Sequence, residues 1–193
     1  MLKSHLKSKH LILASGSPRR QELLKLLDVP FEIRLKSIEE NYPETLKHHQ
    51  ISDFLARMKA NAFDGEVQAH EILLTSDTIV WHHNQALGKP SDYDDAFKML
   101  CQLSGQTHEV ITSICLTSID HQCVANATTR VTFKSLTEEE IHYYIKNFNP
   151  FDKAGAYGIQ EWIGQIGITK IEGSYYNVMG LPMDILYDNL LKF

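Results

Sequence analysis

Residues 11–27, LILASGSPRRQELLKLL, join a short apolar run to a helical pattern and set the architecture of the N-terminal part. Residues 11–14 predict a short buried strand. Ser17 is a suitable N-cap and Pro18 suits the first helical position, so a helix should follow and run to about Asp28. In such a turn, backbone N–H groups and hydroxyl groups meet at the positive end of a helix dipole, which favours an anion. The segment therefore predicts a strand–turn–helix unit with an anion site.

Strand and helix patterns alternate through the rest of the first half. Ser52 is a candidate N-cap for a second helix. The acidic residues after Ser91 suit the first turn of a third helix, where the helix dipole favours negative charge. The expected elements are a strand at 31–35, a loop at 39–49, a helix with Phe54, Leu55, Met58 and Ala62 on its apolar face, a strand at 72–81 interrupted at Ser76-Asp77, and a helix after Ser91.

The second half begins with a long β-hairpin. Residues 107–133 are rich in Val, Ile and Thr, and Asp120-His121 divides them into two runs. Residues 154–180 hold six of the ten glycines and predict a loop-rich region. Two helices complete the expected order, one with a capping box at Thr137 and Glu140 that ends by Asn147, and one from Pro182 with Met183, Leu186 and Leu190 on one face. This layout indicates an α/β or α+β fold on a mixed sheet.

Composition and charge exclude several classes of protein. The chain has 193 residues, which predicts one domain, or one domain with two lobes around a cleft. A formal net charge of −5 argues against a dedicated nucleic-acid binder. No apolar stretch is long enough for a membrane span, and the run at 11–14 is too short for a signal peptide, so we expect a soluble cytoplasmic protein without membrane or nucleic-acid partners.

The sequence also lacks several common site motifs. The three cysteines are odd in number and lack Cys-x-x-Cys spacing, which argues against a disulfide framework or a structural zinc site and predicts buried thiols in a reducing compartment. Gly88-Lys89 is followed by Pro90 and lacks the preceding glycine of a Walker A loop. The doublets His48-His49 and His82-His83 are expected on the solvated surface, because adjacent residues do not face each other.

The anion site in the first turn is the strongest candidate for chemistry. Ser15 and Ser17 supply hydroxyl groups, and Arg19 and Arg20 supply planar donor groups that suit phosphate oxygens. The alternative from these residues alone is a plain helix cap followed by two surface arginines.

Further candidates lie elsewhere in the chain. Asp77 interrupts an apolar strand, where a carboxylate is costly to bury unless it is paired or bound to a metal. Lys89 lies between a glycine and a proline, two residues typical of turns. Lys59 is expected on the polar side of the second helix, and Glu40 belongs to an acidic pair. Each of these has an ordinary structural explanation. Together, hydroxyls, cations and carboxylates are what a triphosphate with a divalent cation requires.

Six motifs occur in an order that resembles a known family. They are LASGSPRRQELL, SDTIV, LGKP, LSGQTHEV, DKAGAYGIQ and IEGSYYNVMGLP. The chain resembles the Maf family of nucleoside triphosphate pyrophosphatases from about residue 11 to residue 186. The resemblance implies a fold similar to the inosine triphosphate pyrophosphatases, with a bent mixed sheet, flanking helices and a central cleft. It also implies hydrolysis of a nucleoside triphosphate to the monophosphate and pyrophosphate with Mg²⁺ or Mn²⁺.

The resemblance also implies roles for individual residues. Asp77 matches the family's proton acceptor, and Glu40 with Asp77 matches its metal site. The residues that match phosphate-binding positions are Ser15, Ser17, Arg19, Arg20, Lys59 and Lys89. Arg19, Thr78 and Gln160 match the specificity positions of the branch that acts on dTTP and UTP. Residues 161–163, Glu-Trp-Ile, depart from the small Gly-Leu-Gly segment that relatives often have.

Two other functions stay open at this stage. A pyrophosphatase of the 7-methyl-GTP branch would have a different pattern where DKAGAYGIQ stands. A nucleotide-binding regulator of cell division would bind without hydrolysis, although the joint presence of Asp77 and the cations argues against it. A homodimer is the commonest oligomer in general, but no feature of the sequence supports one.

Overall fold

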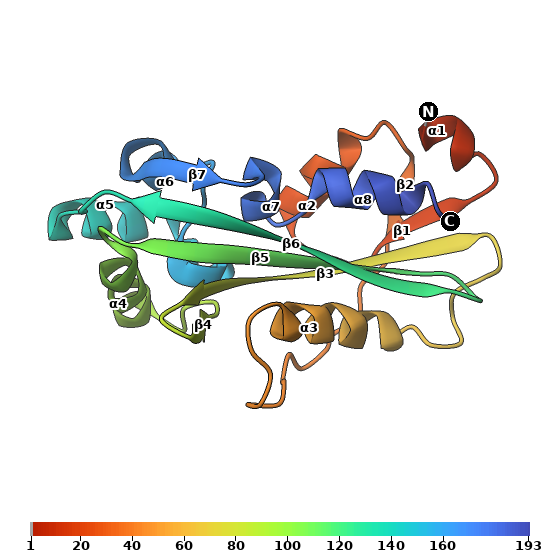
Figure 1. The fold of residues 1–193 in the computed structure, drawn as a ribbon, viewed down its shortest axis with the longest axis horizontal. Helices are drawn as coiled ribbons and strands as arrows, with labels where there is room; N and C mark the ends of the chain where they lie inside the picture. The colour runs from red at the N-terminus through yellow and green to blue at the C-terminus, as the bar shows by residue number, and fades with distance from the viewer. Residues whose placement is uncertain (1) are drawn as a thin grey trace.

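One mixed sheet runs through the computed structural model, which describes residues 2–193 (Figure 1). Within these residues seven strands join in the order β2-β1-β3-β5-β6-β7, and β4 pairs with β3 outside that order. β1 is parallel to β2 and β3, and the remaining pairs are antiparallel. The strands are β1 His10–Leu13, β2 Phe31–Ile33, β3 Glu71–His82, β4 Gln85–Leu87, β5 Thr107–Thr117, β6 Gln122–Phe133 and β7 Ile168–Glu172.

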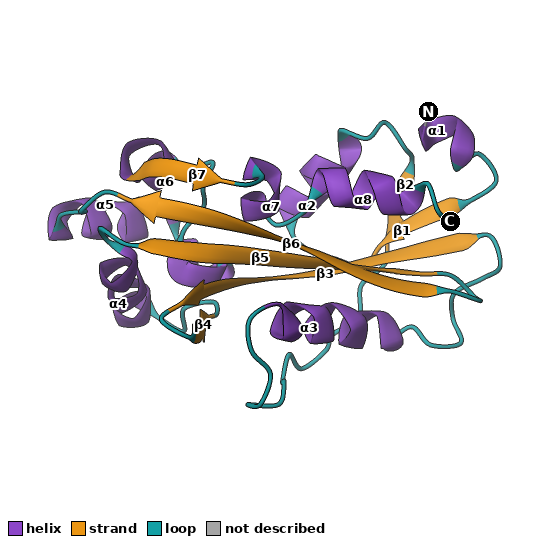
Figure 2. Ribbon diagram, in the orientation of Figure 1, coloured by secondary structure: helices purple, strands orange, loops and turns teal. Residues whose placement is uncertain are grey.

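Helices cover both faces and one end of this sheet (Figure 2). α3 packs on β3 and β5 from one side, while α7 and α8 pack on β5 and β6 from the other. Along residues 2–193, no helix combines the length and the apolar character that a membrane span needs. The helices are α1 Leu2–His5, α2 Pro18–Lys25, α3 His49–Asn61, α4 Tyr93–Leu103, α5 Glu138–Phe148, α6 Trp162–Gly167, α7 Tyr175–Met179 and α8 Met183–Leu190, with 3₁₀ turns η1 Pro150–Asp152 and η2 Ala154–Ala156.

Two large apolar clusters share the long strand β3. Its first half contributes Leu74 to a cluster with side chains of α2, β5 and α8. Its second half contributes Val80 to a cluster with side chains of β6, α4, α5 and α6. Asp77 lies between these two residues and is buried. The middle of β3 is therefore the place where two packed regions meet and a polar side chain is held between them.

The structure confirms the strand–turn–helix junction, the long hairpin and the capping box of α5. α2 begins at Pro18 after Ser17 and ends at Lys25, somewhat earlier than expected. β5 and β6 form the hairpin around residues 118–121. Thr137 and Glu140 make both hydrogen bonds of the capping box. These features rest on signals between neighbours in the chain, which is why their prediction succeeds.

The prediction for α3 is wrong at its start and partly wrong on its face, where Leu55 is buried and Met58 and Ala62 are half-buried as expected. The helix begins at His49, and Ser52 lies buried inside it, where its hydroxyl donates to the His49 carbonyl. Phe54 is exposed, and the buried positions are Ile51, Ser52, Leu55, Ala56 and Ala60. The small residues of this face let the helix lie close to β3 and β5, so the packing partner decides which side is buried.

Two further expectations about backbone structure are wrong. β3 continues without a break through Ser76 and Asp77, which pair with Ile114 and Ser113 of β5. Polar side chains interrupt the apolar pattern there, but the backbone keeps its ladder. Residues 154–180 contain α6, β7 and α7 besides loops. At Gly164, a Cβ atom would collide with the Ile159 carbonyl oxygen, so this glycine allows close packing within folded structure.

The expected positions of some histidines and cysteines are also corrected. His82 is buried and stacks on His83, so this doublet is only partly on the surface. Cys115 is buried, but Cys101 is exposed and Cys123 is half-buried, so the cysteines do not act as a group of core residues.

The buried side chain of His108 should make the free energy of unfolding depend on pH. It is buried on β5 and forms a hydrogen bond of 2.7 Å with the Tyr157 hydroxyl. Burial lowers the pKa of His108 from 6.5 to about 3, and the charge of His82 adds to this effect. In the unfolded chain His108 becomes protonated near pH 6.5, whereas in the native protein it stays neutral until the pH approaches about 3. The unfolding free energy should therefore fall as the pH drops from 6.5 towards 3, by up to about 1.4 kcal/mol per pH unit from this residue.

Urea unfolding of the wild type and of His108→Gln between pH 7 and pH 4 tests this dependence. We expect the unfolding free energy of His108→Gln to depend less steeply on pH than that of the wild type. The difference should be the slope that one titrating proton contributes. His121→Gln is the matched control, because His121 is exposed. Equal slopes in all three proteins would contradict the prediction.

Candidate active site

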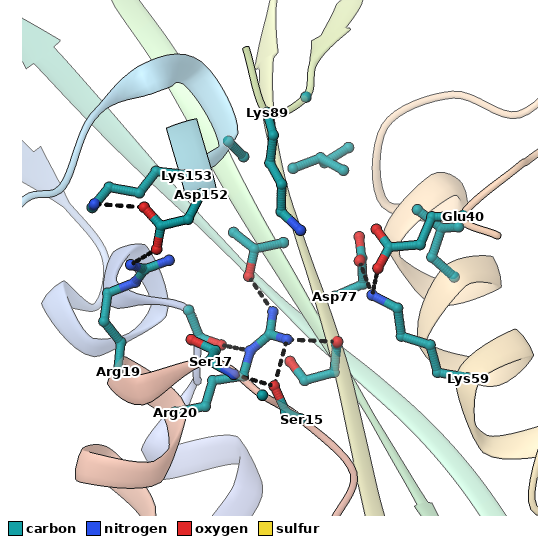
Figure 3. A pocket seen from close by; sticks show the side chains of 18 of the residues that line it. Ser15, Ser17, Arg19, Arg20, Glu40, Lys59, Asp77, Lys89, Asp152 and Lys153 are labelled. Carbon is teal, nitrogen blue, oxygen red and sulfur yellow. Dashed lines mark hydrogen bonds and ion pairs between the residues drawn. The ribbon is translucent and has the colours of Figure 1, made fainter. Parts of the chain in front are cut away.

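A cleft of about 750 Å³ opens over the middle of β3 (Figure 3). Its size suits a ligand as large as a nucleotide. Its walls come from the β1–α2 turn, the loop before α3, α3 itself, β3, the segment after β4, and the stretch from η1 to α6. All of the sequence-predicted site residues line it: Ser15, Ser17, Arg19, Arg20, Glu40, Lys59, Asp77, Thr78, Lys89 and Gln160.

Two carboxylates converge on one ammonium group at the base of the cleft. Lys59 Nζ lies 2.7 Å from Asp77 Oδ1 and 2.9 Å from Glu40 Oε1. Lys59 is therefore not on a solvated side of α3 but on the side that faces the sheet, with its side chain 14% exposed. Glu40 rather than its neighbour Glu39 lines the cleft.

The two carboxyl groups differ in their tendency to hold a proton. Burial raises the pKa of Asp77, although Lys59 and Arg20 oppose the shift. Burial also acts to raise the pKa of Glu40, but the hydrogen bond and charge of Lys59, together with Lys89, outweigh it and lower the pKa overall. Carboxyl pairs whose pKa values are moved apart are typical of sites where one group transfers a proton and the other stays ionised.

The same carboxylates fit a divalent cation. Asp77 Oδ2 is buried without a hydrogen-bond partner, so it has an unused acceptor at the point where Glu40 approaches. Across residues 2–193, no group of three or more His, Cys, Asp or Glu side chains converges as a metal site. Mg²⁺ is commonly held by one or two carboxylates plus phosphate oxygens and water. The donor set therefore suits a cation that arrives with a phosphorylated ligand.

The Arg20 guanidinium group donates hydrogen bonds to backbone and side-chain oxygens of the protein. Its Nε donates to the Gly180 carbonyl at 2.8 Å, and Nη1 donates to the Ser76 carbonyl at 2.8 Å. Nη1 also reaches Ser15 Oγ at 3.4 Å, and Nη2 donates to Thr78 Oγ1 at 3.0 Å. The guanidinium group thus joins α2 to β3 and to the turn before α8. Figure 3 shows it between these elements at the edge of the cleft.

Thr78 takes part in the same network. Its hydroxyl forms a hydrogen bond of 2.9 Å with Thr112, and the Thr112 hydroxyl donates to the Asn177 carbonyl at 2.9 Å. Thr78 lines the cleft, but its polar atom is engaged by Arg20 and β5.

Replacing Arg20 by lysine should destabilise the protein. A single ammonium group cannot serve the Gly180 carbonyl, the Ser76 carbonyl and Thr78 at once, and a buried acceptor without a donor costs about 1–3 kcal/mol. We expect Arg20→Lys to lower the unfolding free energy by about 2 kcal/mol in urea titrations. Arg19→Lys is the matched control and should cost less than about 1 kcal/mol, because it disturbs one partly exposed ion pair. Equal losses in both variants would contradict this prediction.

Arg19 points to the other side of the cleft. Its Nη1 donates to Asp152 Oδ2 at 2.8 Å, and Lys153 Nζ donates to Asp152 Oδ1 at 2.7 Å. Lys89 extends from the segment after β4 into the cleft, between the Asp77 side and the Asp152 side (Figure 3). Ser15 and Ser17 lie at the start of α2, where the Ser17 N–H donates to Ser15 Oγ at 3.3 Å. Cations and hydroxyls thus line both walls.

Gln160 lies in the turn from Gly158 to Glu161, which the Glu161 N–H closes by donating to the Gly158 carbonyl at 3.1 Å. Gln160 Oε1 is buried and has no hydrogen-bond partner. Gln160 lines the cleft, and its unpaired side-chain acceptor suits a ligand with an N–H group.

Comparison with known proteins gives the family. A protein-family model described as Maf-like protein matches residues 10–193. The chain belongs to the Maf family. A Flavobacterium psychrophilum protein named dTTP/UTP pyrophosphatase is 58% identical over 192 residues, covering 100% of this chain and 98% of that one. A Flavobacterium johnsoniae protein of the same name is 58% identical over 190 residues, covering 98% of each chain.

A solved structure supports the fold of this Maf protein. The Staphylococcus aureus Ham1 protein superposes with a TM-score of 0.53 at 14% identity, over 94% of this chain and 98% of that one. At this identity the likeness concerns the fold alone. The expected mixed sheet with flanking helices and a central cleft is confirmed.

Two residues of the Maf cleft were not singled out by sequence reasoning. Asp152 and Lys153 stand in the motif DKAGAYGIQ, whose glycines begin the stretch that was expected to be rich in loops. The structure places Asp152 against Arg19, 133 positions earlier in the chain. The available signal was an acidic residue next to a basic one inside a glycine-rich motif. The sequence did not show that Arg19 would be the partner of Asp152.

Proposed function

We propose that this Maf protein hydrolyses dTTP and UTP to the nucleoside monophosphate and pyrophosphate. The observation that carries the proposal is the convergence of Asp77 and Glu40 on Lys59, in a cleft also lined by Lys89 and the α2 turn. The names of the two Flavobacterium relatives support the choice of substrate. Modified pyrimidine nucleotides belong to the same substrate class.

Glu40 and Asp77 would hold a divalent cation, Mg²⁺ or Mn²⁺, together with phosphate oxygens. When bound, the cation neutralises charge that develops on the phosphates. Glu40, with its lowered pKa, stays ionised and suits a ligand role. Asp77, with its raised pKa, suits the base that removes a proton from the attacking water.

The reaction is a displacement at the α-phosphorus. Asp77 accepts a proton from water as the water oxygen forms a bond to phosphorus, and the bond to the pyrophosphate oxygen breaks. Lys59 and Lys89 stabilise the negative charge of the phosphates, and Arg19 can turn to them from Asp152. Catalysis of this kind consists mainly of positioning and electrostatic stabilisation.

The α2 turn contributes to phosphate binding in two ways. Ser15, Ser17 and the first backbone N–H groups of α2 offer donors at the positive end of the helix. Arg20 keeps this turn against β3 through its bonds to Ser76 and Thr78. We therefore assign Arg20 and Thr78 an indirect part in substrate binding, through the position of the turn.

Gln160 would recognise the base. Its amide has an acceptor and a donor side by side, and the N3–H and O4 edge of uracil or thymine has the complementary pair. The unpartnered Oε1 agrees with this assignment, because a bound pyrimidine would supply its missing donor.

We also propose that the chain acts as one Maf-like domain, with the cleft between two lobes, in the cytoplasm. Its three cysteines are unpaired, and one of them is exposed, which suits a reducing compartment.

A substrate panel tests the proposed function. Purified protein is incubated with Mg²⁺ or Mn²⁺ and dTTP, UTP, CTP, GTP, 7-methyl-GTP, ITP or their diphosphates, and the products are resolved. We expect pyrophosphate from dTTP and UTP. Pyrophosphate from 7-methyl-GTP alone would keep the chemistry and overturn the assignment of Gln160. Nucleotide binding without turnover under either metal would favour the regulatory function instead.

A further inference from the structure

The turn that carries Gln160 is held by side chains outside the cleft. Gln160 is the third residue of the turn that begins at Gly158. Tyr144 of α5 is fully buried beneath this turn, and its hydroxyl oxygen accepts a hydrogen bond from the Gly158 N–H at 3.0 Å. The same hydroxyl donates to Glu161 Oε2. One tyrosine hydroxyl therefore ties both ends of the turn to α5.

The carboxylate of Glu161 folds back over the turn. A Cβ atom on Gly158 would lie only 2.8 Å from the Glu161 carboxyl carbon, so the side chain packs against the bare backbone there. Its other oxygen, Oε1, is 3.1 Å from Lys153 Nζ. Glu161 is therefore fixed by a hydroxyl on one side and an ammonium group on the other. It does not line the cleft, so it is not placed to contact a ligand there.

Lys153 connects this turn to the phosphate side of the site. Its side chain is 9% exposed, and its charge is balanced by Asp152 at 2.7 Å and Glu161 at 3.1 Å. Asp152 also accepts from Arg19. A chain of alternating charges thus runs from Arg19 through Asp152 and Lys153 to Glu161. Removing the last charge leaves Lys153 with a single counter-ion and loosens the end of the chain at Gln160.

We infer that Glu161 is a positioning residue for recognition of the pyrimidine base. Its carboxylate, held by Tyr144 and Lys153, fixes the turn so that the Gln160 amide meets the base in one orientation. The inference rests on the proposed function, because it assumes that Gln160 reads the base.

The test compares Glu161→Gln and Tyr144→Phe with the exposed control Glu139→Gln on α5. Glu161→Gln keeps the size of the side chain but removes the charge beside Lys153. Tyr144→Phe keeps the ring packing but removes the hydroxyl. We expect both to lower the ratio of kcat/KM for dTTP to that for dCTP by about tenfold, mainly through KM for dTTP. A misplacement of about 1 Å can cost about a hundredfold, and the loss of one tether should move the amide by less. The control should keep the wild-type ratio.

A double variant separates positioning from general support of the fold. If Glu161 acts through Gln160, Gln160→Ala combined with Glu161→Gln should discriminate no worse than Gln160→Ala alone. Equal losses for dTTP and dCTP, or additive losses in the double variant, would overturn the inference. If Glu161→Gln does not fold, Tyr144→Phe decides by the same criteria.

A binding measurement keeps this test distinct from the test of the proposed function. Calorimetric titration with dTMP and dCMP reports base preference without turnover. Should the wild type release no pyrophosphate, the proposed reaction fails, and a loss of dTMP preference in Glu161→Gln would still support the positioning role. An unchanged preference in both variants, or no preference in the wild type, would overturn it.

Discussion

Asp77→Asn should reduce pyrophosphate release from dTTP and UTP by roughly a thousandfold or more, because a positioned general base contributes factors of this order. The amide cannot accept the proton of the attacking water, and it is a poor ligand for a divalent cation. Asparagine has nearly the same shape as aspartate, so the strand β3 and its ladder to Ser113 should remain. Lys59 keeps Glu40 as a counter-ion at 2.9 Å.

The measurement is steady-state release of pyrophosphate, with thermal unfolding recorded on the same preparation. Asp120→Asn is the control, because it removes an exposed carboxylate at the tip of the hairpin and should leave the rate unchanged. A wild-type rate in Asp77→Asn would exclude Asp77 as the base. A large drop in the unfolding temperature would instead assign the loss of activity to the fold.

Gln160→Ala should lower discrimination between UTP and CTP by about a hundredfold, with a smaller effect on the turnover of UTP. A site that pairs hydrogen-bonding groups with its substrate rejects mismatched analogues strongly, and that rejection depends on the polar groups that make the pairs. The phosphate side of the cleft does not involve this amide, so the hydrolytic step should largely persist.

The comparison uses kcat/KM for UTP and CTP in the wild type, Gln160→Ala and Gln165→Ala. Gln165 is an exposed glutamine on α6, near Gln160 in the chain, and serves as the matched control. An unchanged UTP-to-CTP ratio in Gln160→Ala would remove base recognition from this residue. The same change in both variants would assign the effect to general disturbance of α6.

Local signals predicted the parts of the fold that depend on neighbours in the chain. The helix start at Ser17-Pro18 and the capping box at Thr137 are both set within a single helical turn, and the structure contains both, although the Ser17 side chain makes no capping hydrogen bond. α3 shows the limit of this approach. Its buried face follows from contact with β3 and β5, and the positions of Ala56 and Ala60 acquire meaning only when that surface is known.

The site shows a similar division. Every site residue expected from the sequence lines the cleft, and all of them except Glu40 and Lys59 stand in the family motifs. The sequence did not predict their partners. Arg19 and Arg20 are adjacent, yet one pairs with Asp152 and the other with the backbone of Ser76 and Gly180, because neighbouring positions on a helix point in different directions. Pairings between residues far apart in the chain depend on the complete fold.

The unbroken course of β3 has a consequence for how the protein comes apart. Because the strand supplies Leu74 to one apolar cluster and Val80 to the other, neither cluster can open fully without disturbing the ladder that the other needs. The backbone amide of Asp77 should therefore exchange with solvent deuterium only in the global unfolding event. The proposed base is then anchored in the slowest-exchanging part of the molecule, while the groups around it are carried by loops and helix ends.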